Sequence, residues 1–322
     1  MPKVSVIIPV YGVEKYLKRC ACSLFEQTID DIEYLFIDDC TLDKSIEILY
    51  KVLEDYPQRK AQVVVHKMTQ NSGQAAVRKW GMQNATGEYV IHCDSDDWVD
   101  INMYEEMYNK ATEEKADVVV CDYTLHNGVK AQQRVKGCGS IIYQEFLQRL
   151  FFQKDSWSLC NKLFSRKLYN NDNIIYPKGN MGEDMCMTLQ LLSRCKKISY
   201  VPKDFYKYFI NPCSITRKLT KDICLNNYSQ LKGNYDIIFN LFNNESTPKC
   251  IREGLLYLKC HVNNILIPLV GNKEYYDEWR KLYSGFWIKL LCSKHIEFMF
   301  KLRILLTLCH LFPRRKYRVS MK

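Results

Sequence analysis

The chain lacks the short signatures of several common enzyme and metal-binding classes. It has no GxxxxGK[ST] phosphate loop, no GxSxG turn and no HExxH helix, which argues against P-loop NTPases, serine-elbow hydrolases and HExxH zinc proteases. No CxxC pair occurs among its 15 cysteines, so a structural zinc site is not expected. Several cysteines lie in apolar runs, which predicts buried thiols in a reducing cytoplasm and no disulfide framework. These are Cys93, Cys121, Cys186 and Cys309.

Long apolar runs are absent as well. The longest uncharged stretch near the end covers Ile304 to Pro313, far short of the roughly 18 residues that a membrane-spanning helix needs. The segment Met1 to Pro9 lacks the charged and apolar layout of a signal peptide, so we do not expect export by that route. No repeat of about 20 to 50 residues is found, which disfavours a solenoid.

The composition is that of a folded protein. With 322 residues, 47% hydrophobic and 25% charged, the chain can bury a substantial core in one large or two modest domains. Its net charge of +10 is uneven, because residues 216–322 hold 19 Lys and Arg against 8 Asp and Glu. That asymmetry suggests an anionic surface as partner, either membrane headgroups or nucleic acid, and a merely solvated basic face is the alternative.

Strand-like and helix-like segments alternate through the first 120 residues. This alternation, with continuous apolar strands, predicts an α/β fold with a mostly parallel sheet and helices on both faces. The expected strands are Val4–Val10, Glu33–Ile37, Gln62–His66, Tyr89–Cys93 and Asp117–Cys121. The expected helices are Val13–Gln27, Asp43–Tyr56, Ser72–Ala85 and Trp98–Lys115.

The second half of the chain reads differently. Residues 122–139 look polar and irregular, and helices are then expected over Tyr143–Phe152, Arg166–Tyr169 and Glu183–Cys195. After Ser214 only helical patterns remain, over Lys221–Asn243, Pro248–Leu269 and Lys273–Tyr283. We therefore expect two domains, an α/β catalytic domain over residues 1–216 and a basic helical subdomain over residues 217–322.

The segment Phe286 to Phe312 mixes aromatic and aliphatic residues with lysine and arginine and is followed by Pro313-Arg314-Arg315-Lys316. This composition is typical of a helix that lies on a membrane surface, since basic side chains add attraction to anionic lipids. The alternative is a core helix that packs on the subdomain.

The most informative motif is the acidic tetrad Asp94-Ser95-Asp96-Asp97, which directly follows a predicted strand. Ligands of open α/β sheets bind outside the carboxyl ends of the strands, and carboxylates there suit Mg²⁺ or Mn²⁺ carrying phosphates. One acid would suffice to cap the next helix, whereas three within four positions repel one another unless a cation is present.

Three further segments carry candidate site residues, and the first of them, Asp38-Asp39, is expected at the same sheet edge as the tetrad. Asp38-Asp39 ends the second strand and could contact a base or ribose or cap the following helix. Asn71 to Arg78 opens a helix whose amino end favours an anion, and Arg78 could pair with a pyrophosphate or with a tetrad acid. Glu183-Asp184 opens a later helix, where a carboxylate could act as general base or simply favour the first helical turn.

In order and spacing, these segments closely resemble glycosyltransferase family 2. The resemblance rests on Val4-Ser5-Val6-Ile7-Ile8-Pro9-Val10-Tyr11, Ile37-Asp38-Asp39, Asn71-Ser72-Gly73 with Arg78, Thr86-Gly87-Glu88-Tyr89, the tetrad and Gly182-Glu183-Asp184. It is strong over the first 120 residues and moderate over 157–216, through Trp157, Lys162, the acidic pair and Ser214-Ile215-Thr216. One departure is Cys40-Thr41-Leu42, where relatives more often have Gly-Ser-Thr.

The resemblance implies a GT-A fold, which is Rossmann-like, and an inverting transfer from a nucleotide sugar, usually linked to UDP, with Mn²⁺ or Mg²⁺. Pro9, Tyr11 and Asp39 would then line the nucleotide pocket, with Arg78 near the diphosphate and Asp94 and Ser95 near ribose or metal. Asp96 would be the leading cation ligand, Asp94 a second, and Asp97 a rival for the leading role. Asp184 would be the base that deprotonates the acceptor hydroxyl, with Glu183 beside it.

The membrane-spanning helices and Trp motif of processive family members are missing, which favours transfer of single sugars. The expected acceptor is a glycan or lipid-linked saccharide in surface polysaccharide synthesis, at the cytoplasmic face of the membrane, and no nucleic-acid partner is expected. A nucleotidyltransferase would have a glycine-rich loop after the first strand, and a DxD-type phosphatase an Asp there. The remaining alternative is an inactive membrane-associated scaffold or glycan-binding relative.

Overall fold

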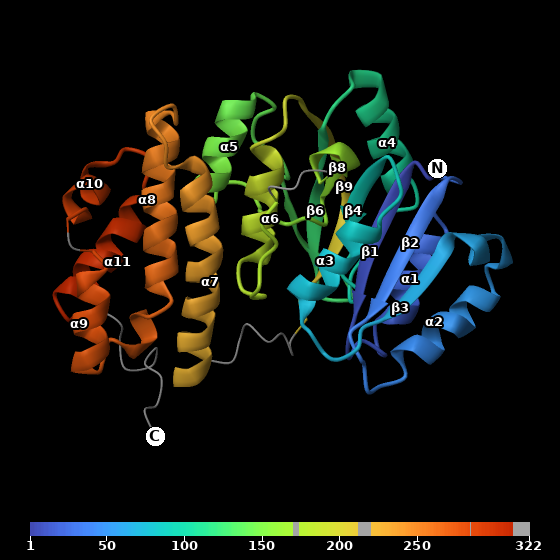
Figure 1. Ribbon diagram of the computed structural model, residues 1–322, viewed down its shortest axis with the longest axis horizontal. Helices are drawn as coiled ribbons and strands as arrows, with labels where there is room; N and C mark the ends of the chain where they lie inside the picture. The colour runs from blue at the N-terminus through green and yellow to red at the C-terminus, as the bar shows by residue number, and fades with distance from the viewer. Residues whose placement is uncertain (170–173, 212–219, 284, 312–322) are drawn as a thin grey trace.

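The computed structural model describes residues 1–169, 174–211, 220–283 and 285–311 (Figure 1). Two of the segments singled out above, Ser214-Ile215-Thr216 and Pro313-Arg314-Arg315-Lys316, lie outside the described residues. Within them the chain forms an α/β structure with additional helices toward its C-terminal end, as predicted.

The first four strands form a parallel half-sheet in the order β3-β2-β1-β4. Each predicted strand and helix of this region is confirmed to within a few residues, because apolar strands alternate with helices that have one apolar face. The strands are β1 (Val4–Val10), β2 (Ile32–Asp38), β3 (Val63–Lys67) and β4 (Tyr89–His92). The helices are α1 (Leu17–Phe25), α2 (Ser45–Glu54), η1 (Pro57–Gln62) and α3 (Gln74–Asn84).

The sheet continues as a mixed half in the order β4-β8-β6-β9-β5, and β7 pairs with β6. The parallel pairings, including β6 with β9, involve most of the paired residues, while β8 runs antiparallel to β4 and β6. The strands are β5 (Trp98–Val99), β6 (Val118–His126), β7 (Ala131–Val135), β8 (Lys162–Ser165) and β9 (Ile198–Phe209).

This half corrects three sequence predictions. The helix expected over Trp98–Lys115 begins only at α4 (Met103–Glu114), because Trp98 and Val99 pair with β9. Residues 122–139, expected to be irregular, contain the β6–β7 hairpin, whose outer strand is mostly exposed and polar. β8 and β9 were not predicted, since four residues give no periodicity and β9 lacks a regular alternation of buried and exposed positions.

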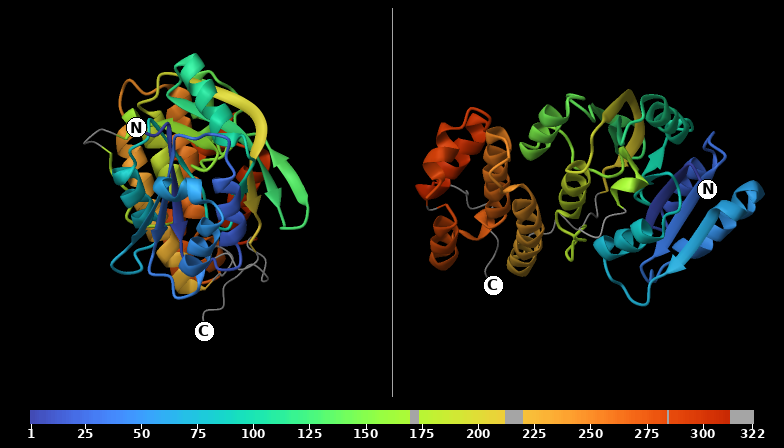
Figure 2. Two further views of the ribbon diagram at one scale, coloured as in Figure 1. Left: turned by 90° about the vertical axis from the view of Figure 1, so that its right-hand side faces the viewer. Right: turned by 45° about the horizontal axis from the view of Figure 1, so that its top comes forward.

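Two hydrophobic clusters cover the two faces of the sheet. Val6 and Ile8 of β1 pack with α1, α2 and α4, whereas Ile7 points to the opposite face and joins the cluster of the remaining helices. Those helices are α3, α5 (Tyr143–Phe151), α6 (Glu183–Leu192), α7 (Lys221–Phe242) and α8 (Lys249–Asn264). Figure 2 shows the sheet with helices on both sides. The predicted helix at Arg166–Tyr169 is the short 3-10 turn η2 (Arg166–Leu168).

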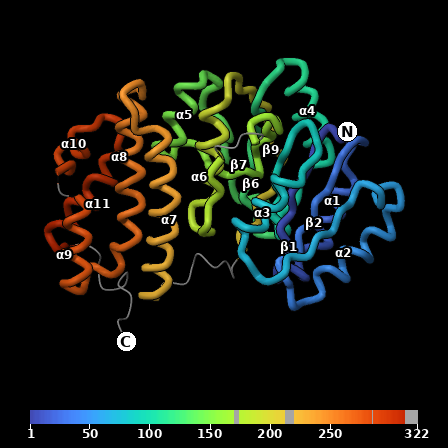
Figure 3. The backbone as a smooth tube through the Cα atoms, viewed as in Figure 1, coloured from blue at the N-terminus to red at the C-terminus, as the bar shows by residue number. Residues whose placement is uncertain are grey.

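The C-terminal helices lie at the end of the molecule opposite the strands β1, β2 and β3. The tube in Figure 3 shows this as a change of colour from blue to red. A third cluster around buried Trp279 joins η4 (Ile267–Leu269), α9 (Lys273–Lys281), α10 (Trp287–Cys292) and α11 (Phe298–Leu308). The helices α7 and α8 pack in the same hydrophobic cluster as the sheet, although they come after residue 216 in the chain. The division into two domains at that residue therefore stays a prediction. No helix in the described ranges is long and apolar enough to cross a membrane.

The segment 286–312, expected as a single surface helix, contains two short helices. α10 ends at Cys292, because the next residue, Ser293, has an extended backbone, and α11 begins after Glu297. Leu290 and Ile304 are buried in the third cluster. The neighbouring apolar residues Trp287, Ile288, Phe298 and Met299 are exposed.

Candidate active site

Parallel pairing brings the acidic segments to one edge of the sheet. β1 lies between β2 and β4, so the Asp38-Asp39 pair after β2 and the tetrad after β4 flank the end of β1. Pro9 is half-buried near that end, and Tyr11, just beyond it, is 50% exposed. The predicted donor-side residues are thus gathered outside the carboxyl ends of three adjacent strands.

The Asp39 side chain accepts hydrogen bonds from the loop that leads into α3. Its Oδ1 accepts a hydrogen bond of 2.7 Å from the Ser72 N–H, and its Oδ2 accepts one of 2.9 Å from the Gly73 N–H. The N–H of Ala75 donates to Asn180 Oδ1 at 3.0 Å. The amino end of α3, expected as an anion site, is therefore already bound by side chains of the protein, and contact of Asp39 with a base stays a prediction.

The tetrad forms a turn in which the Asp97 N–H donates to the Asp94 carbonyl at 3.0 Å. It does not cap a helix, because β5 follows directly and α4 begins only at Met103. Ser95 is buried in this turn.

The three tetrad carboxylates differ in what they contact. Asp94 Oδ1 accepts from Arg78 Nη2 at 2.6 Å and from Gln74 Nε2 at 3.1 Å. Asp96 Oδ2 accepts from Asn211 Nδ2 at 3.2 Å, and burial, followed by the nearby Asp94 charge, raises the pKa of Asp96. Asp94 and Asp96 are both partly exposed.

Asp97 is fully buried, with Oδ1 accepting from the Phe209 N–H at 2.6 Å and Oδ2 from the Tyr206 hydroxyl. Burial raises the pKa of Asp97 well above its usual range. Both of its oxygens hold the tetrad turn against β9, so the structure disfavours Asp97 as a metal ligand.

At the opposite side of the site, α6 begins with Glu183 and Asp184 immediately after Gly182, whose φ of +76° gives a left-handed turn that suits glycine. The Glu183 side chain is 4% exposed and that of Asp184 is 39% exposed. Burial raises the pKa of Glu183 well above its usual value, with repulsion from Asp184 in the same direction and Arg78 opposing both. Of these two carboxylates, Asp184 is therefore the one that solvent can reach.

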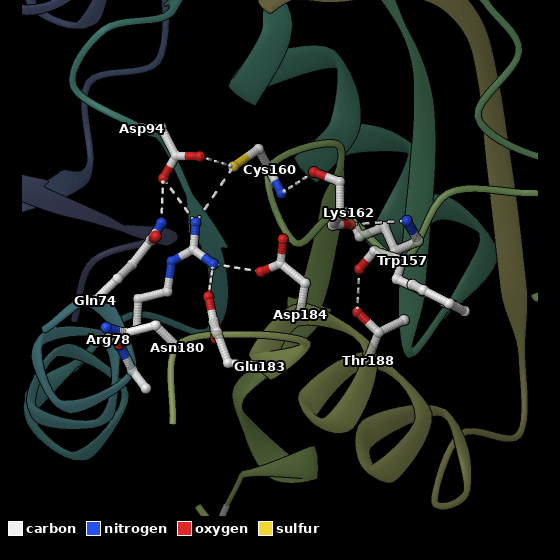
Figure 4. Close-up of polar contacts among 12 residues, drawn as sticks. Gln74, Arg78, Asp94, Trp157, Cys160, Lys162, Asn180, Glu183, Asp184 and Thr188 are labelled. Carbon is white, nitrogen blue, oxygen red and sulfur yellow. Dashed lines mark hydrogen bonds and ion pairs between the residues drawn. The ribbon is translucent and has the colours of Figure 1, made fainter. Parts of the chain in front are cut away.

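Arg78 joins the two sides. Its Nη2 contacts Asp94, and its Nη1 contacts both Glu183 Oε1 and Asp184 Oδ1 (Figure 4). Burial acts to lower the pKa of Arg78, but attraction to Asp184, Asp94 and Glu183 outweighs burial and raises the pKa well above its usual value. The sequence left a pyrophosphate and a tetrad acid as possible partners of Arg78, and the contacts of Arg78 in this structure include the tetrad acid Asp94.

Sequence reasoning did not assign a site role to the segment 156–162, which lies beside Asp184 in Figure 4. Lys162 is fully buried, and its Nζ donates to the carbonyls of Ser156 and Ser158 at 2.7 and 2.8 Å and to Asn161 Oδ1 at 2.9 Å. Burial lowers the pKa of Lys162 to about 8, with the Asp184 charge opposing that shift. A lysine directly before the apolar pair Leu163-Phe164 was the available sequence signal. His92 is also buried.

The oxygen donors fit a divalent cation only in part. No cluster of three or more His, Cys, Asp or Glu residues that could hold a metal ion is found in the described ranges. Two carboxylates, Asp94 and Asp96, nevertheless lie in one turn at the sheet edge, and Mg²⁺ is commonly held by one or two carboxylates together with substrate phosphates. The residues present therefore fit a cation whose remaining ligands would come from a bound diphosphate.

Comparison with known proteins agrees with this arrangement. Residues 5–172, more than half of the chain, match the family model described as glycosyl transferase family 2. Glycosyltransferase GlyA of Streptococcus pneumoniae is 29% identical over 230 residues, which is 68% of this chain and 32% of GlyA. The uncharacterized glycosyltransferase EpsJ of Bacillus subtilis is 27% identical over 224 residues, 67% of this chain and 63% of EpsJ. The chain thus spans 32% of the length of GlyA and 63% of the length of EpsJ, in each case less than two thirds.

Solved structures share the fold at low sequence identity. S. aureus TarS has a TM-score of 0.68 at 19% identity, covering 95% of this chain and 53% of TarS. Its 1–349 fragment in complex with UDP-GlcNAc has a TM-score of 0.62 at 20% identity, covering 89% of this chain and 76% of that one. A mannosyltransferase from Pyrobaculum calidifontis in complex with GDP-Man and Mn²⁺ has a TM-score of 0.56 at 13% identity, covering 98% and 82%.

Proposed function

Because the chain belongs to glycosyl transferase family 2 and is a glycosyltransferase, we propose that it transfers one sugar from a UDP-linked donor to an acceptor hydroxyl with inversion at the anomeric carbon. The observation that carries the proposal is the position of Asp184. Its carboxylate is accessible, and one guanidinium links it to Asp94 at the donor edge.

In the proposed reaction Asp184 takes the proton of the acceptor hydroxyl. The hydroxyl oxygen forms a bond to the anomeric carbon on the face opposite the diphosphate, and the bond from that carbon to the phosphate oxygen breaks. Its electron pair leaves with the nucleoside diphosphate, so the configuration inverts. A general base of this kind contributes about 10²- to 10⁴-fold to a rate.

For the donor we propose the sheet edge formed by Pro9, Tyr11, Asp39, Asp94 and Ser95. The complex of the TarS fragment with UDP-GlcNAc supports a nucleotide sugar at such a fold. Asp94 and Asp96 would hold Mn²⁺ or Mg²⁺, and the Mn²⁺ in the Pyrobaculum mannosyltransferase supports this choice. When bound, the cation would neutralise charge on the departing diphosphate.

For the acceptor we propose a glycan or a lipid-linked saccharide in surface polysaccharide synthesis, reached from the cytoplasmic membrane surface. The net positive charge of residues 216–322 supports this placement. So do exposed Trp287, Ile288, Phe298 and Met299 on α10 and α11, which lie beside exposed Lys289 and Lys294.

Sedimentation with vesicles containing anionic phosphatidylglycerol tests the membrane proposal. The double substitution Trp287→Ser and Phe298→Ser should reduce binding, whereas Val129→Ser, at a still more exposed apolar residue of the β6–β7 turn, should not. Equal binding by both variants would count against the placement.

The transfer proposal is tested with a panel of nucleotide sugars and Mn²⁺, measuring release of the nucleoside diphosphate. Release from one UDP-sugar, abolished by Asp96→Ala, is the expected result. Absence of release from every donor, together with absence of UDP binding by calorimetry, would favour an inactive scaffold or a glycan-binding protein.

A further inference from the structure

Arg78 is a buried cation whose three charged partners all belong to the candidate site. Its side chain is 1% exposed, and its two terminal nitrogens contact Asp94, Glu183 and Asp184. Figure 4 shows the guanidinium between the Asp94 turn and the start of α6. Other charged or titratable groups that face it are Cys160, His92 and, across Asp184, Lys162.

These contacts leave little room for a phosphate. Nη2 is shared by Asp94 and the Cys160 sulfur, and Nη1 is shared by Glu183 and Asp184. The remaining nitrogen, Nε, has no partner among the described residues but is buried. A diphosphate could reach the guanidinium only by displacing one of these carboxylates.

We propose that Arg78 is a positioning residue for the base and not a ligand of the diphosphate. Its planar fork holds Asp184 of α6 in register with Asp94 after β4, so that the base faces the sugar held at the donor edge. This inference rests on the proposed function, because it assigns Asp184 as the base. A guanidinium suits this task because it presents several donors in one rigid plane.

Charge balance supports the same role. Asp94, Glu183 and Asp184 would repel one another without a cation between them. Glu183 is buried and has no other ion-pair partner in the described part of the chain, and the positive charge of Arg78 opposes the rise that burial causes in the pKa of Glu183.

The substitution Arg78→Lys separates the two roles, because lysine keeps the charge but lacks the rigid fork. We expect kcat to fall about 100-fold, the size of effect that follows from misplacing a reacting group by about 1 Å. The dissociation constant of UDP, measured by calorimetry without Mn²⁺ because Asp94 is both a proposed cation ligand and a partner of Arg78, should stay nearly unchanged. A variant with normal kcat and weakened UDP binding would overturn the inference.

A double variant tests whether Arg78 acts through Asp184. If it does, adding Arg78→Lys to Asp184→Asn should lower the residual rate little further, since residues that act as a unit are not additive. Independent, multiplicative losses would contradict the inference. Arg78→Gln should show the same split between kcat and UDP binding if the lysine variant is too unstable to assay.

Arg59→Lys is a matched control. Arg59 is also buried, but it donates to backbone carbonyls of Phe25, Gln27 and Ile29, away from the acidic groups. It should lower stability without the selective loss of kcat. An inactive wild type would overturn the proposed function and this inference together, whereas an active wild type with an Arg78→Lys variant that only loses UDP affinity would overturn this inference alone.

Discussion

Asn180 accepts, at its Oδ1, a hydrogen bond of 3.0 Å from the backbone N–H of Ala75, 105 positions earlier in the chain. This bond joins the first turn of α3, which carries Arg78, to the loop ahead of α6, which carries Asp184. Arg78 and the proposed base Asp184 therefore belong to two helices whose amino ends are connected by this hydrogen bond.

The same contact makes Gly73 sensitive to substitution. Gly73 has φ +81° and ψ 162°, a conformation that is essentially restricted to glycine, and a Cβ there would lie 2.6 Å from Asn180 Nδ2. Gly73→Ala should lower the free energy of unfolding by about 1 to 3 kcal/mol and reduce turnover. Urea denaturation and UDP release measure the two effects.

Gly285→Ala is the control, because Gly285 also has a positive φ but no neighbour within 4 Å of its added Cβ. Gly285→Ala should also lower the free energy of unfolding, because alanine is strained at a positive φ, but it should leave turnover unchanged. Equal losses of turnover in both variants would show that the contact with Asn180 does not matter to the site.

Asp96 and Asp97 should respond in opposite ways to replacement by asparagine. Asp97→Asn disturbs two buried hydrogen bonds, to Tyr206 and Phe209, and should cost about 1 to 3 kcal/mol of stability. Asp96→Asn should alter stability little but weaken UDP binding in the presence of Mn²⁺. Urea denaturation measures the effect on stability, and calorimetry with Mn²⁺ and with EDTA measures the effect on UDP binding. Loss of Mn²⁺-dependent UDP binding in Asp97→Asn, with loss of stability in Asp96→Asn, would make Asp97 the cation ligand.

Lys162 should give the fold a specific pH dependence. Its pKa is lowered by burial to about 8 in the folded state, against about 10.4 in an unfolded chain. Between these values the unfolded state binds more protons, so the contribution of Lys162 to stability rises with pH and is lost as pH falls toward 8. Between these two pH values the contribution of Lys162 to the free energy of unfolding should change by an amount on the order of 3 kcal/mol.

Other groups titrate in the same range, so the measurement is a difference. The free energy of unfolding of wild type minus that of Lys162→Met should increase from pH 8 to about pH 10.4 and be constant below pH 8. A difference that does not change with pH would mean that Lys162 keeps an ordinary pKa in the folded protein.

The parallel half of the fold was predictable because its signals are local. Val4–Val10 and Tyr89–His92 are continuous apolar runs, and the helices between them have one apolar face. β8 and β9 were missed because their strand character comes from pairing with β6, which is distant in sequence. The single helix expected at 286–312 is interrupted at Ser293, whose backbone is extended.

In the site, sequence order sufficed to predict that the acids after β2 and β4 meet at one edge, since parallel strands end together. It did not reveal which carboxylates face inward. Asp97 and Glu183 are buried, whereas their neighbours Asp96 and Asp184 are partly exposed, and that difference depends on β9 and on Arg78. The roles of the site residues stay predictions until they are measured.

Substitution of Asp184 by asparagine tests the central proposal most directly. With the donor identified from the panel, sugar transfer by Asp184→Asn should fall about 10²- to 10⁴-fold, the contribution of a general base. Binding of the donor with Mn²⁺, measured in parallel by calorimetry, should be retained. A variant that transfers sugar at the wild-type rate, or one that loses activity only because it no longer binds donor, would contradict the assignment of Asp184 as the base.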